Sequence, residues 1–256
     1  MTVEKVKYSE QNGIAYITIN NPKKMNALDF EVYDGLYSAF RAIEDNDEVK
    51  TAILTGEGDK AFVCGQDINT FKMYPPPEAK KFLRRVLHMF IDLESLSKPV
   101  IAAVNGLALG GGTEIILACD MVVASENARF GLPEAGVGVV PIWGVIRLAH
   151  AVGRYKAKEL MMTGEIISAE EANRIGLVNK VVPPGKVLEA AEEIARKIMS
   201  KAPLAIDLIK SSINRDVLPE GTAFTNQTNK YFFETEDLKE GVDAFLNKRK
   251  PKFRGR

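Results

Sequence analysis

Residues 106–115, GLALGGGTEI, join three consecutive glycines to a carboxylate within an otherwise apolar run. One interpretation is structural, because Gly110, Gly111 and Gly112 allow the unusual backbone angles of a tight strand-to-helix connection. A second interpretation is chemical. The first N–H groups of a helix have no intrahelical partner and carry partial positive charge, so they can bind an oxyanion that comes close to a bare backbone.

The segment AFVCGQDI, residues 61–68, offers a second donor of the same kind. Gly65 ends an apolar strand pattern, and the N–H of Gln66 can turn outward there. Together with the glycine stretch, this donor would form an oxyanion hole, which stabilises negative charge on a carbonyl oxygen. Asp67 follows directly, and it either fixes the loop through local hydrogen bonds or takes part in catalysis.

Other catalytic and nucleotide-binding motifs are missing from the sequence. The glycine stretch lacks the spacing of the dinucleotide fingerprint, and no Gly-Lys-Ser/Thr of a phosphate loop follows it. No Gly-x-Ser-x-Gly is present, and Cys64 has no neighbouring partner that would activate it. We interpret His88 and His150 as packing or surface residues. With two cysteines and two histidines, neither a disulfide framework nor a metal site is expected.

Strand and helix patterns alternate along the chain and predict an α/β fold. An Asn12-Gly13 turn joins two alternating runs in a hairpin, and Asp29 is the expected N-cap of an amphipathic helix. Ser168 and Glu171 form a capping box before a later helix. Further strands are expected at 51–56, 61–64, 99–104, 120–125, 128–132 and 177–182. Further helices are expected after 77, at about 113–119, beyond 153 and throughout the chain from about 184.

Length and composition are those of a globular chain with a full core: 256 residues, 46% hydrophobic and 27% charged. The 34 Lys and Arg residues balance 34 Asp and Glu residues, which argues against nucleic acid or an anionic membrane as the main partner. The N-terminus has no continuous apolar stretch for a signal peptide, and polar residues interrupt the longest apolar region. We therefore expect a cytoplasmic protein that binds neither nucleic acid nor membranes.

The order and spacing of the motifs resemble those of the crotonase superfamily, the enoyl-CoA hydratases and isomerases. The motifs are NPKKMNAL, AFVCGQDI, the run from KPVIAAVNG to GVGVVP, MMTGEIISAEEANRIGLVNKVVP and EGVDAFLNKRKPKF. The resemblance covers nearly the whole chain. It implies a crotonase-like spiral of repeated ββα units over residues 1–195 and a C-terminal helical region for oligomerisation over residues 196–256. It also implies homotrimers that often pair into hexamers, and acyl-CoA thioesters as substrates.

The resemblance further implies the catalytic groups. The oxyanion-hole donors match the N–H groups of Gln66 and Gly111, and Glu114 and Glu134 match the paired glutamates of the hydratases. Taken singly, each glutamate also has a structural interpretation, as a charge that complements a helix dipole or as a cap. As a pair they can share one water, with Glu114 activating it and Glu134 exchanging a proton at the α-carbon. Isomerases of the family commonly lack the glutamate that matches Glu114.

Substrate contacts follow from the same resemblance. Similar proteins hold the adenine of CoA near the loop that runs here from Lys24 to Ala27, so Lys24 either faces phosphate or is a solvated loop lysine. Trp143 lies in PIWGVIRL, which departs from the longer glycine-rich stretch of many hydratases, and it either borders the acyl pocket or packs in the core. Many relatives carry alanine in place of Gln66. The predicted substrate-binding residues are Lys24, Ala27, Gln66, Asp67, Ile68, Gly110, Gly111 and Trp143.

We therefore expect an enoyl-CoA hydratase or, in reverse, a 3-hydroxyacyl-CoA dehydratase, a hydro-lyase that works without a metal or cofactor. A second hypothesis is another crotonase-type enzyme, an isomerase or a hydrolase, and the altered segment 141–148 motivates it. A third hypothesis, of a different class, is an RNA-binding or scaffold protein on the same fold. The balanced charge gives that third hypothesis little support.

Overall fold

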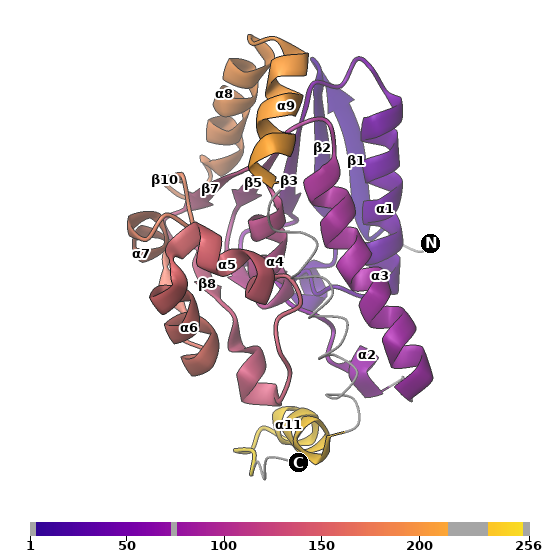
Figure 1. The fold of residues 1–256 in the computed structure, drawn as a ribbon, viewed down its shortest axis with the longest axis vertical. Helices are drawn as coiled ribbons and strands as arrows, with labels where there is room; N and C mark the ends of the chain where they lie inside the picture. Colours follow the sequence, from indigo (N-terminus) through magenta and orange to yellow (C-terminus); the bar gives the residue numbers. More distant parts are fainter. Residues whose placement is uncertain (1–3, 73–75, 215–234, 253–256) are drawn as a thin grey trace.

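Two β-sheets lie at the centre of the structure, and helices surround them (Figure 1). The computed structural model describes residues 4–72, 76–214 and 235–252. The first sheet has the strand order β1-β2-β3-β5-β7-β10, and the second has the order β4-β6-β8-β9. The strands of the first sheet are β1 (Val6–Gln11), β2 (Ile14–Ile19), β3 (Thr51–Gly56), β5 (Val100–Val104), β7 (Met121–Ser125) and β10 (Lys180–Val182). Those of the second are β4 (Ala61–Cys64), β6 (Leu107–Leu109), β8 (Arg129–Gly131) and β9 (Ile167–Ser168).

The helices cover both sheets and extend into the C-terminal region. They are α1 (Phe30–Asp45), α2 (Asn69–Lys72), α3 (Pro76–Ser95), α4 (Gly111–Ala118), α5 (Gly144–Val152), α6 (Arg154–Thr163), α7 (Ala169–Arg174), α8 (Val187–Met199), α9 (Pro203–Asn214) and α11 (Glu236–Leu246). Two short 3-10 helices, η1 (Pro22–Lys24) and η2 (Pro133–Val137), lie in loops.

A ββα unit repeats along the chain. Each of β3, β5 and β7 in the first sheet is followed by one strand of the second sheet, β4, β6 or β8, and then by helical structure. Within each sheet these successive strands pair in parallel. This repeat confirms the spiral expected from the sequence motifs. Because β4, β6 and β8 are neighbours and parallel, the loops that leave their carboxyl ends meet at one place.

Local signals in the sequence set where several helices begin. The Asp29 carboxylate accepts a hydrogen bond from the N–H of Val32 at 3.1 Å, as expected of the N-cap of α1. The Ser168 hydroxyl accepts the N–H of Glu171 at 3.1 Å. The Glu171 carboxylate forms its contact with Arg174 at 2.7 Å, so the structure has the serine half of the predicted capping box.

Alternate residues of the central strands face two apolar layers. In β3, Leu54 lies in the larger layer, which fills the space among the two sheets, α1, α3 and α4, whereas Ile53 faces α8. Both side chains are fully buried. Small residues of α8, such as Ala191 and Ala195, complete the second layer. Burial of both sheet faces explains why these strands read as continuous apolar runs in the sequence.

Two strands of the second sheet, β6 and β9, were not expected from the sequence. β6 has three residues and β9 has two, which is too short for an alternating pattern to show. β6 is nevertheless central to the site, because it pairs with both β4 and β8 and leads directly into the glycine stretch. Residues 107–109 therefore form a strand because they pair with β4 and β8, which are distant in sequence.

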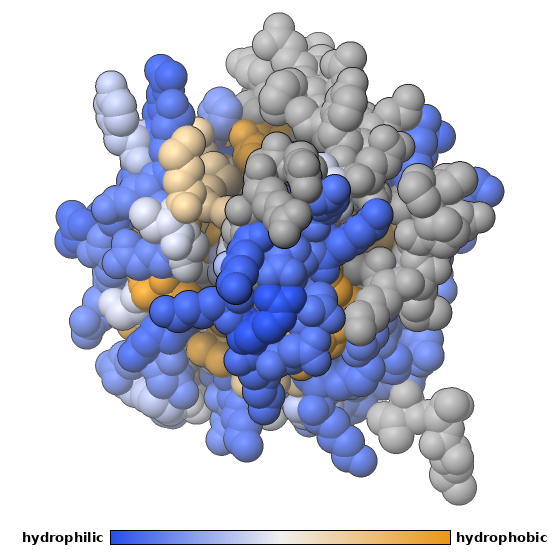
Figure 2. Space-filling model, turned by 90° about the horizontal axis from the view of Figure 1, so that it is seen from below, coloured by the Kyte–Doolittle hydropathy of each residue, from blue (hydrophilic) through white to orange (hydrophobic). Residues whose placement is uncertain are grey.

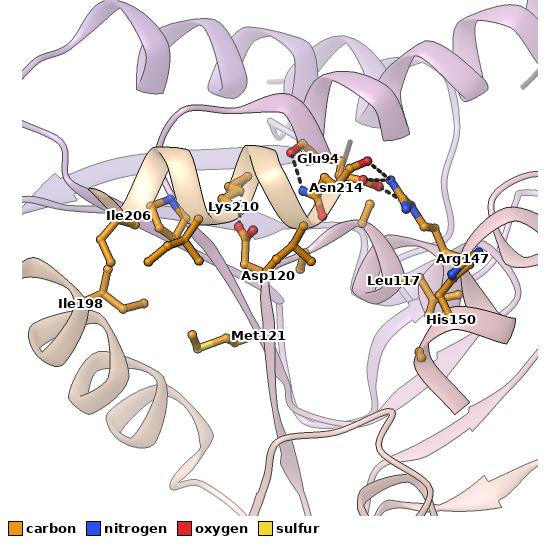
Figure 3. Close-up of a pocket in the computed structure, with 16 residues that line it drawn as sticks. Glu94, Leu117, Asp120, Met121, Arg147, His150, Ile198, Ile206, Lys210 and Asn214 are labelled. Atoms are coloured by element: carbon orange, nitrogen blue, oxygen red, sulfur yellow. Dashed lines mark hydrogen bonds and ion pairs between the residues drawn. The ribbon is translucent and has the colours of Figure 1, made fainter. Parts of the chain in front are cut away.

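Helix α9 lies beside α8 at one end of the molecule, and an ion pair and a hydrogen bond from Arg147 hold it to the core (Figures 1 and 3). The Lys210 ammonium of α9 lies 2.8 Å from the Asp120 carboxylate. Arg147 binds the Glu94 carboxylate and also donates to the carbonyl oxygen of Asn214, at the end of α9, at 3.2 Å. These residues line a cavity of about 450 Å³ beneath α9.

Helix α11 lies at the opposite end of the molecule and packs on η2. Gly241 permits this close approach, because a Cβ atom there would overlap the carbonyl oxygen of Val137. Seen from that end, the coloured surface is mostly hydrophilic (Figure 2).

None of the helices in the described ranges has the length and apolar content to cross a membrane. The predicted domain boundary at 195/196 falls inside α8 and stays a prediction.

Candidate active site

The two predicted oxyanion-hole donors lie side by side. Cys64 at the end of β4 pairs with Leu109 at the end of β6, so the next residues of both strands leave the sheet together. A Cβ atom built on Gly65 would lie only 3.8 Å from the nitrogen of Gly111. Gly111 is the first residue of α4, so the helix has no carbonyl oxygen for its N–H.

The backbone N–H of Gln66 points away from the segment at Leu28, with which Gln66 pairs. Gln66 forms a parallel bridge with Leu28, in which the Gly65 carbonyl oxygen accepts the Leu28 N–H and the Asp67 N–H donates to the Leu28 carbonyl oxygen, each at 2.8 Å. In such a parallel bridge the N–H and carbonyl groups of Gln66 itself point away from Leu28, because only its two neighbours bond to that residue. The side away from Leu28 carries β6 and Gly111, so the Gln66 and Gly111 amides face a common region.

At Gly110 and Gly112 the structure shows why a residue without a side chain is needed. Gly110 has φ 53° and ψ −122°, a conformation that side chains disfavour, and a Cβ atom there would lie 3.1 Å from Glu134 Oε1. A Cβ atom on Gly112 would overlap the carbonyl oxygen of Val63 in β4. The structural and the chemical interpretations of the three glycines are therefore compatible, since the tight turn is what brings the amide of Gly111 beside Gly65.

Glu114 is buried one turn into α4, with 5% of its surface exposed. Its Oε1 atom accepts the N–H groups of Trp143 at 2.5 Å and Gly144 at 2.9 Å, at the start of α5. Burial raises the pKa of Glu114 to about 7, although these backbone N–H groups act in the opposite direction. The carboxylate therefore sits at the N-terminus of a second helix, which favours its charged form.

Glu134 lies in η2, just after β8, with its Oε1 atom close to Gly110. Its Oε2 atom is buried and has no hydrogen-bond partner in the part of the chain that the structure describes. Burial and the nearby charge of Glu114 raise the pKa of Glu134 to about 8. The pair therefore holds a proton near neutral pH, as an acid and a base in one site would require.

The loops predicted to hold CoA are joined to each other. The Lys24 ammonium lies 2.6 Å from the Asp67 carboxylate, and Asp67 also accepts the N–H of Asn69 at 3.1 Å. Burial raises the pKa of Asp67, but the hydrogen bonds from Lys24 and Asn69 outweigh it and leave the pKa below its usual value. Asp67 thus fixes the loop, which was one of the two interpretations of this residue. Lys24 remains about half exposed, at 55%.

The other predicted substrate contacts differ in exposure. Ala27 is buried in the loop before α1, and Ile68 is partly exposed beside Asp67. Trp143 is fully buried, and its ring stacks on Phe90 with the ring centroids 5.6 Å apart. The packing interpretation of Trp143 therefore holds for its side chain. Its contribution to the site is the backbone N–H that binds Glu114, a role that the sequence did not predict.

Two further groups near the site were missed at the sequence level. Gly144 donates its N–H to Glu114, and the only local signal was a glycine at the start of an apolar helical run. Tyr33, on the buried face of α1, donates its hydroxyl to the side-chain oxygen of Gln66 at 2.6 Å. Across the described ranges, no group of three or more His, Cys, Asp or Glu side chains is placed to hold a metal ion.

Comparison with known proteins shows the family of the chain. The family model for enoyl-CoA hydratase/isomerase matches residues 9–256. The short-chain-enoyl-CoA hydratase of Clostridium acetobutylicum is 45% identical over 98% of this chain and 97% of that protein. The crotonyl-CoA hydratase of Syntrophomonas wolfei is 41% identical over 99% of both. The crystal structure of a carnitinyl-CoA hydratase from Mycobacterium avium has a TM-score of 0.88 at 35% identity and covers 100% of both chains. The family expected from the motifs is confirmed: the chain belongs to the enoyl-CoA hydratase/isomerase family.

Proposed function

We propose that the protein is an enoyl-CoA hydratase, which adds water across the 2,3 double bond of an acyl-CoA thioester, or removes it in reverse. The observation that carries this proposal is a pair of glutamates beside two convergent backbone amides: Glu114 is buried, and Glu134 is partly buried with its Oε2 atom shielded from solvent. A double-bond isomerase needs one group to move a proton between carbons. A second carboxylate, in addition, is what the activation of a water requires.

The oxyanion hole provides the first part of the mechanism. The thioester carbonyl oxygen accepts the N–H groups of Gln66 and Gly111, and the N-terminal end of α4 adds its dipole. Addition at C3 moves electrons toward this oxygen, so negative charge develops where the two donors already point. The donors thus stabilise the enolate-like state more than the substrate, which is what accelerates the step.

The two glutamates provide the second part. The oxygen of the water forms a bond to C3, and Glu114 accepts the proton that this water releases. Glu134 donates a proton to C2, and the proton held by Glu114 replaces it, so one water is added and the pair is regenerated. The amides of Trp143 and Gly144 favour the charged form of Glu114, whereas burial and the charge of Glu114 disfavour the charged form of Glu134, which supports this assignment.

The CoA part is expected to lie along the joined loops at Lys24 and Asp67, with the acyl chain directed toward the glutamates. The names of the two relatives point to short acyl chains, and we extend this preference to the present chain.

Hydration changes no oxidation state, so the proposed reaction needs no redox cofactor. The cytoplasmic location stays a prediction.

The test is incubation with a panel of 2-enoyl-CoA and 3-hydroxyacyl-CoA esters, followed by mass spectrometry. A gain or loss of one water supports the hydratase. A shifted double bond with no change in mass identifies an isomerase, and release of free CoA identifies a hydrolase. No turnover, together with salt-dependent RNA binding, would contradict the enzyme and favour the RNA-binding alternative.

The pH dependence of kcat/KM is expected to be bell-shaped, with both limbs well above the ordinary range of glutamic acid, about 4.3. Below a pKa of about 7 the base Glu114 becomes protonated, and above a pKa of about 8 the acid Glu134 loses its proton. Rates on a short 2-enoyl-CoA across this range measure the profile. The Glu134→Gln variant should lose the upper limb, and a flat profile for the wild type would contradict the assignment.

We also propose that the chain forms a homotrimer, alone or paired into a hexamer, through α9. The inner side of this helix is tied to the core by Lys210, but Leu204 and Leu208 on the opposite side are 78% and 63% exposed. Apolar side chains in such a row indicate a surface that another chain covers. Leu208→Glu is expected to convert the trimer to a monomer in light scattering, and Lys158→Glu, at an exposed polar site on α6, serves as the control. A trimeric Leu208→Glu variant would contradict the proposal.

A further inference from the structure

The side chain of Gln66 turns away from the oxyanion hole and into the protein. Its Oε1 atom accepts the Tyr33 hydroxyl at 2.6 Å. Its Nε2 atom donates to the carbonyl oxygen of Leu28 at 2.8 Å and to the hydroxyl of Thr70 at 3.0 Å. The three partners come from α1, from the loop before α1 and from α2, so one side chain joins three segments at the hole.

The partners of this side chain are themselves held in place. Tyr33 is 1% exposed, and its ring packs edge-on against Phe82 with the centroids 6.1 Å apart. Burial and the nearby charge of Glu114 raise the pKa of Tyr33 well above its usual value, so the hydroxyl stays protonated and can donate. Thr70 is 4% exposed and donates its hydroxyl to the carbonyl oxygen of Asp67 at 2.6 Å.

The peptide group that carries the Gln66 N–H needs such support. It follows Gly65, which has φ 70° and no side chain to restrict its rotation. Rotation at Gly65 would swing the amide out of line with the carbonyl oxygen that it must stabilise. The Leu28 carbonyl oxygen accepts both the Asp67 N–H and the Gln66 side chain, so the backbone and the side chain of this turn are fixed to the same atom.

We propose that Gln66 is a positioning residue for its own backbone amide: its side chain, anchored on Tyr33, holds the N–H in the direction that the oxyanion requires. The proposal rests on the hydratase function proposed above. Alanine at this position would keep the donor but lose all three side-chain bonds. The alignment of the donor, which determines the stabilisation of the transition state, would then be weakened while substrate contacts elsewhere remain.

The experiment compares Gln66→Ala, Tyr33→Phe and Tyr37→Phe. Tyr37 is the matched control, because it lies one turn along α1 and donates its hydroxyl to the carbonyl oxygen of Arg85 at 2.7 Å, away from the hole. On a short 2-enoyl-CoA, we expect kcat to fall about tenfold in Gln66→Ala and several-fold in Tyr33→Phe, with KM within about twofold of wild type. Tyr37→Phe should match the wild type.

A second readout does not depend on turnover. An enoyl-CoA with an electron-donating aryl group on its double bond absorbs at longer wavelength when its carbonyl is polarised, so its spectrum when bound reports on the hole. Gln66→Ala and Tyr33→Phe should reduce this shift. Should the wild type shift the spectrum but fail to hydrate any thioester, the hydratase function would be wrong and the positioning role would still be tested.

A double-mutant cycle separates this role from an effect of Tyr33 on Glu114. If Tyr33 acts through Gln66, the double variant loses no more kcat than Gln66→Ala alone, and the limbs of the pH profile stay in place. Multiplicative losses, or a displaced pH profile in Tyr33→Phe, would overturn the proposal. So would an unchanged kcat and spectrum in Tyr33→Phe, which decides the question even if Gln66→Ala does not fold.

Discussion

Replacing Glu114 by glutamine is expected to lower kcat for hydration by roughly 10²- to 10⁴-fold, the range for loss of a general acid or base. Glutamine keeps an oxygen that can accept the N–H groups of Trp143 and Gly144, which Glu114 accepts at 2.5 and 2.9 Å. The start of α5 should therefore stay in place. What is lost is the ability to accept a proton from water, so steady-state rates fall while the Kd for a 3-hydroxyacyl-CoA changes little.

Glu134→Gln is expected to cause a loss of similar size, and isotope exchange separates the two roles. If Glu134 exchanges the proton at C2, its glutamine variant should fail to introduce solvent deuterium at C2 of a saturated acyl-CoA. The Glu114→Gln variant should retain much of this exchange, because no water is added to a saturated chain. Mass spectrometry of the recovered thioester measures both.

The control for this pair is Glu126→Gln, at an exposed position after β7, which should have wild-type rates. Thermal unfolding and thioester binding of all three variants show whether the site is intact. A wild-type rate in either active-site variant would contradict the acid–base assignment, and equal exchange in both would contradict the division of roles.

Gly111→Pro is expected to lower kcat by about 10²- to 10³-fold, the usual cost of removing one oxyanion-hole donor. Gly111 is the first residue of α4, a position at which helices accept proline because its missing N–H has no intrahelical partner. The substitution therefore replaces the donor N–H by the ring Cδ of proline, which also takes up space in the hole, with little expected change in the helix. Far-ultraviolet circular dichroism checks the fold, and steady-state kinetics on a short 2-enoyl-CoA measures the loss.

Gly111→Ala is the matched variant, because it adds a side chain but keeps the N–H. Its Cβ atom would lie 2.9 Å from Cδ1 of Leu28, the movable end of a side chain, so only a small adjustment is needed. We expect a much smaller loss of kcat than in the proline variant. Equal losses in the two variants would show that added bulk, and not the missing donor, is responsible.

Features that depend on neighbouring residues could be predicted from the sequence. The hairpin turn has φ 53° at Asn12 and φ 78° at Gly13, both positive, as the dipeptide required. The N-cap of α1 at Asp29 depends on an N–H three residues away. The glycine stretch and the two glutamates were also recognisable, because their order and spacing match family motifs that cover nearly the whole chain.

The sequence alone determined which groups are available: two amides next to glycines and two carboxylates, Glu114 and Glu134. Tertiary structure decided how those groups behave. Trp143 and Gly144, about thirty residues beyond Glu114, supply its hydrogen bonds. Tyr33 lies on α1, far from Gln66 in sequence, yet donates to its side chain. The protonation and burial of the carboxylates and the direction of the amides depend on contacts between segments that are distant in sequence. Such contacts form only when the ββα turns stack. No local sequence pattern could therefore have specified them.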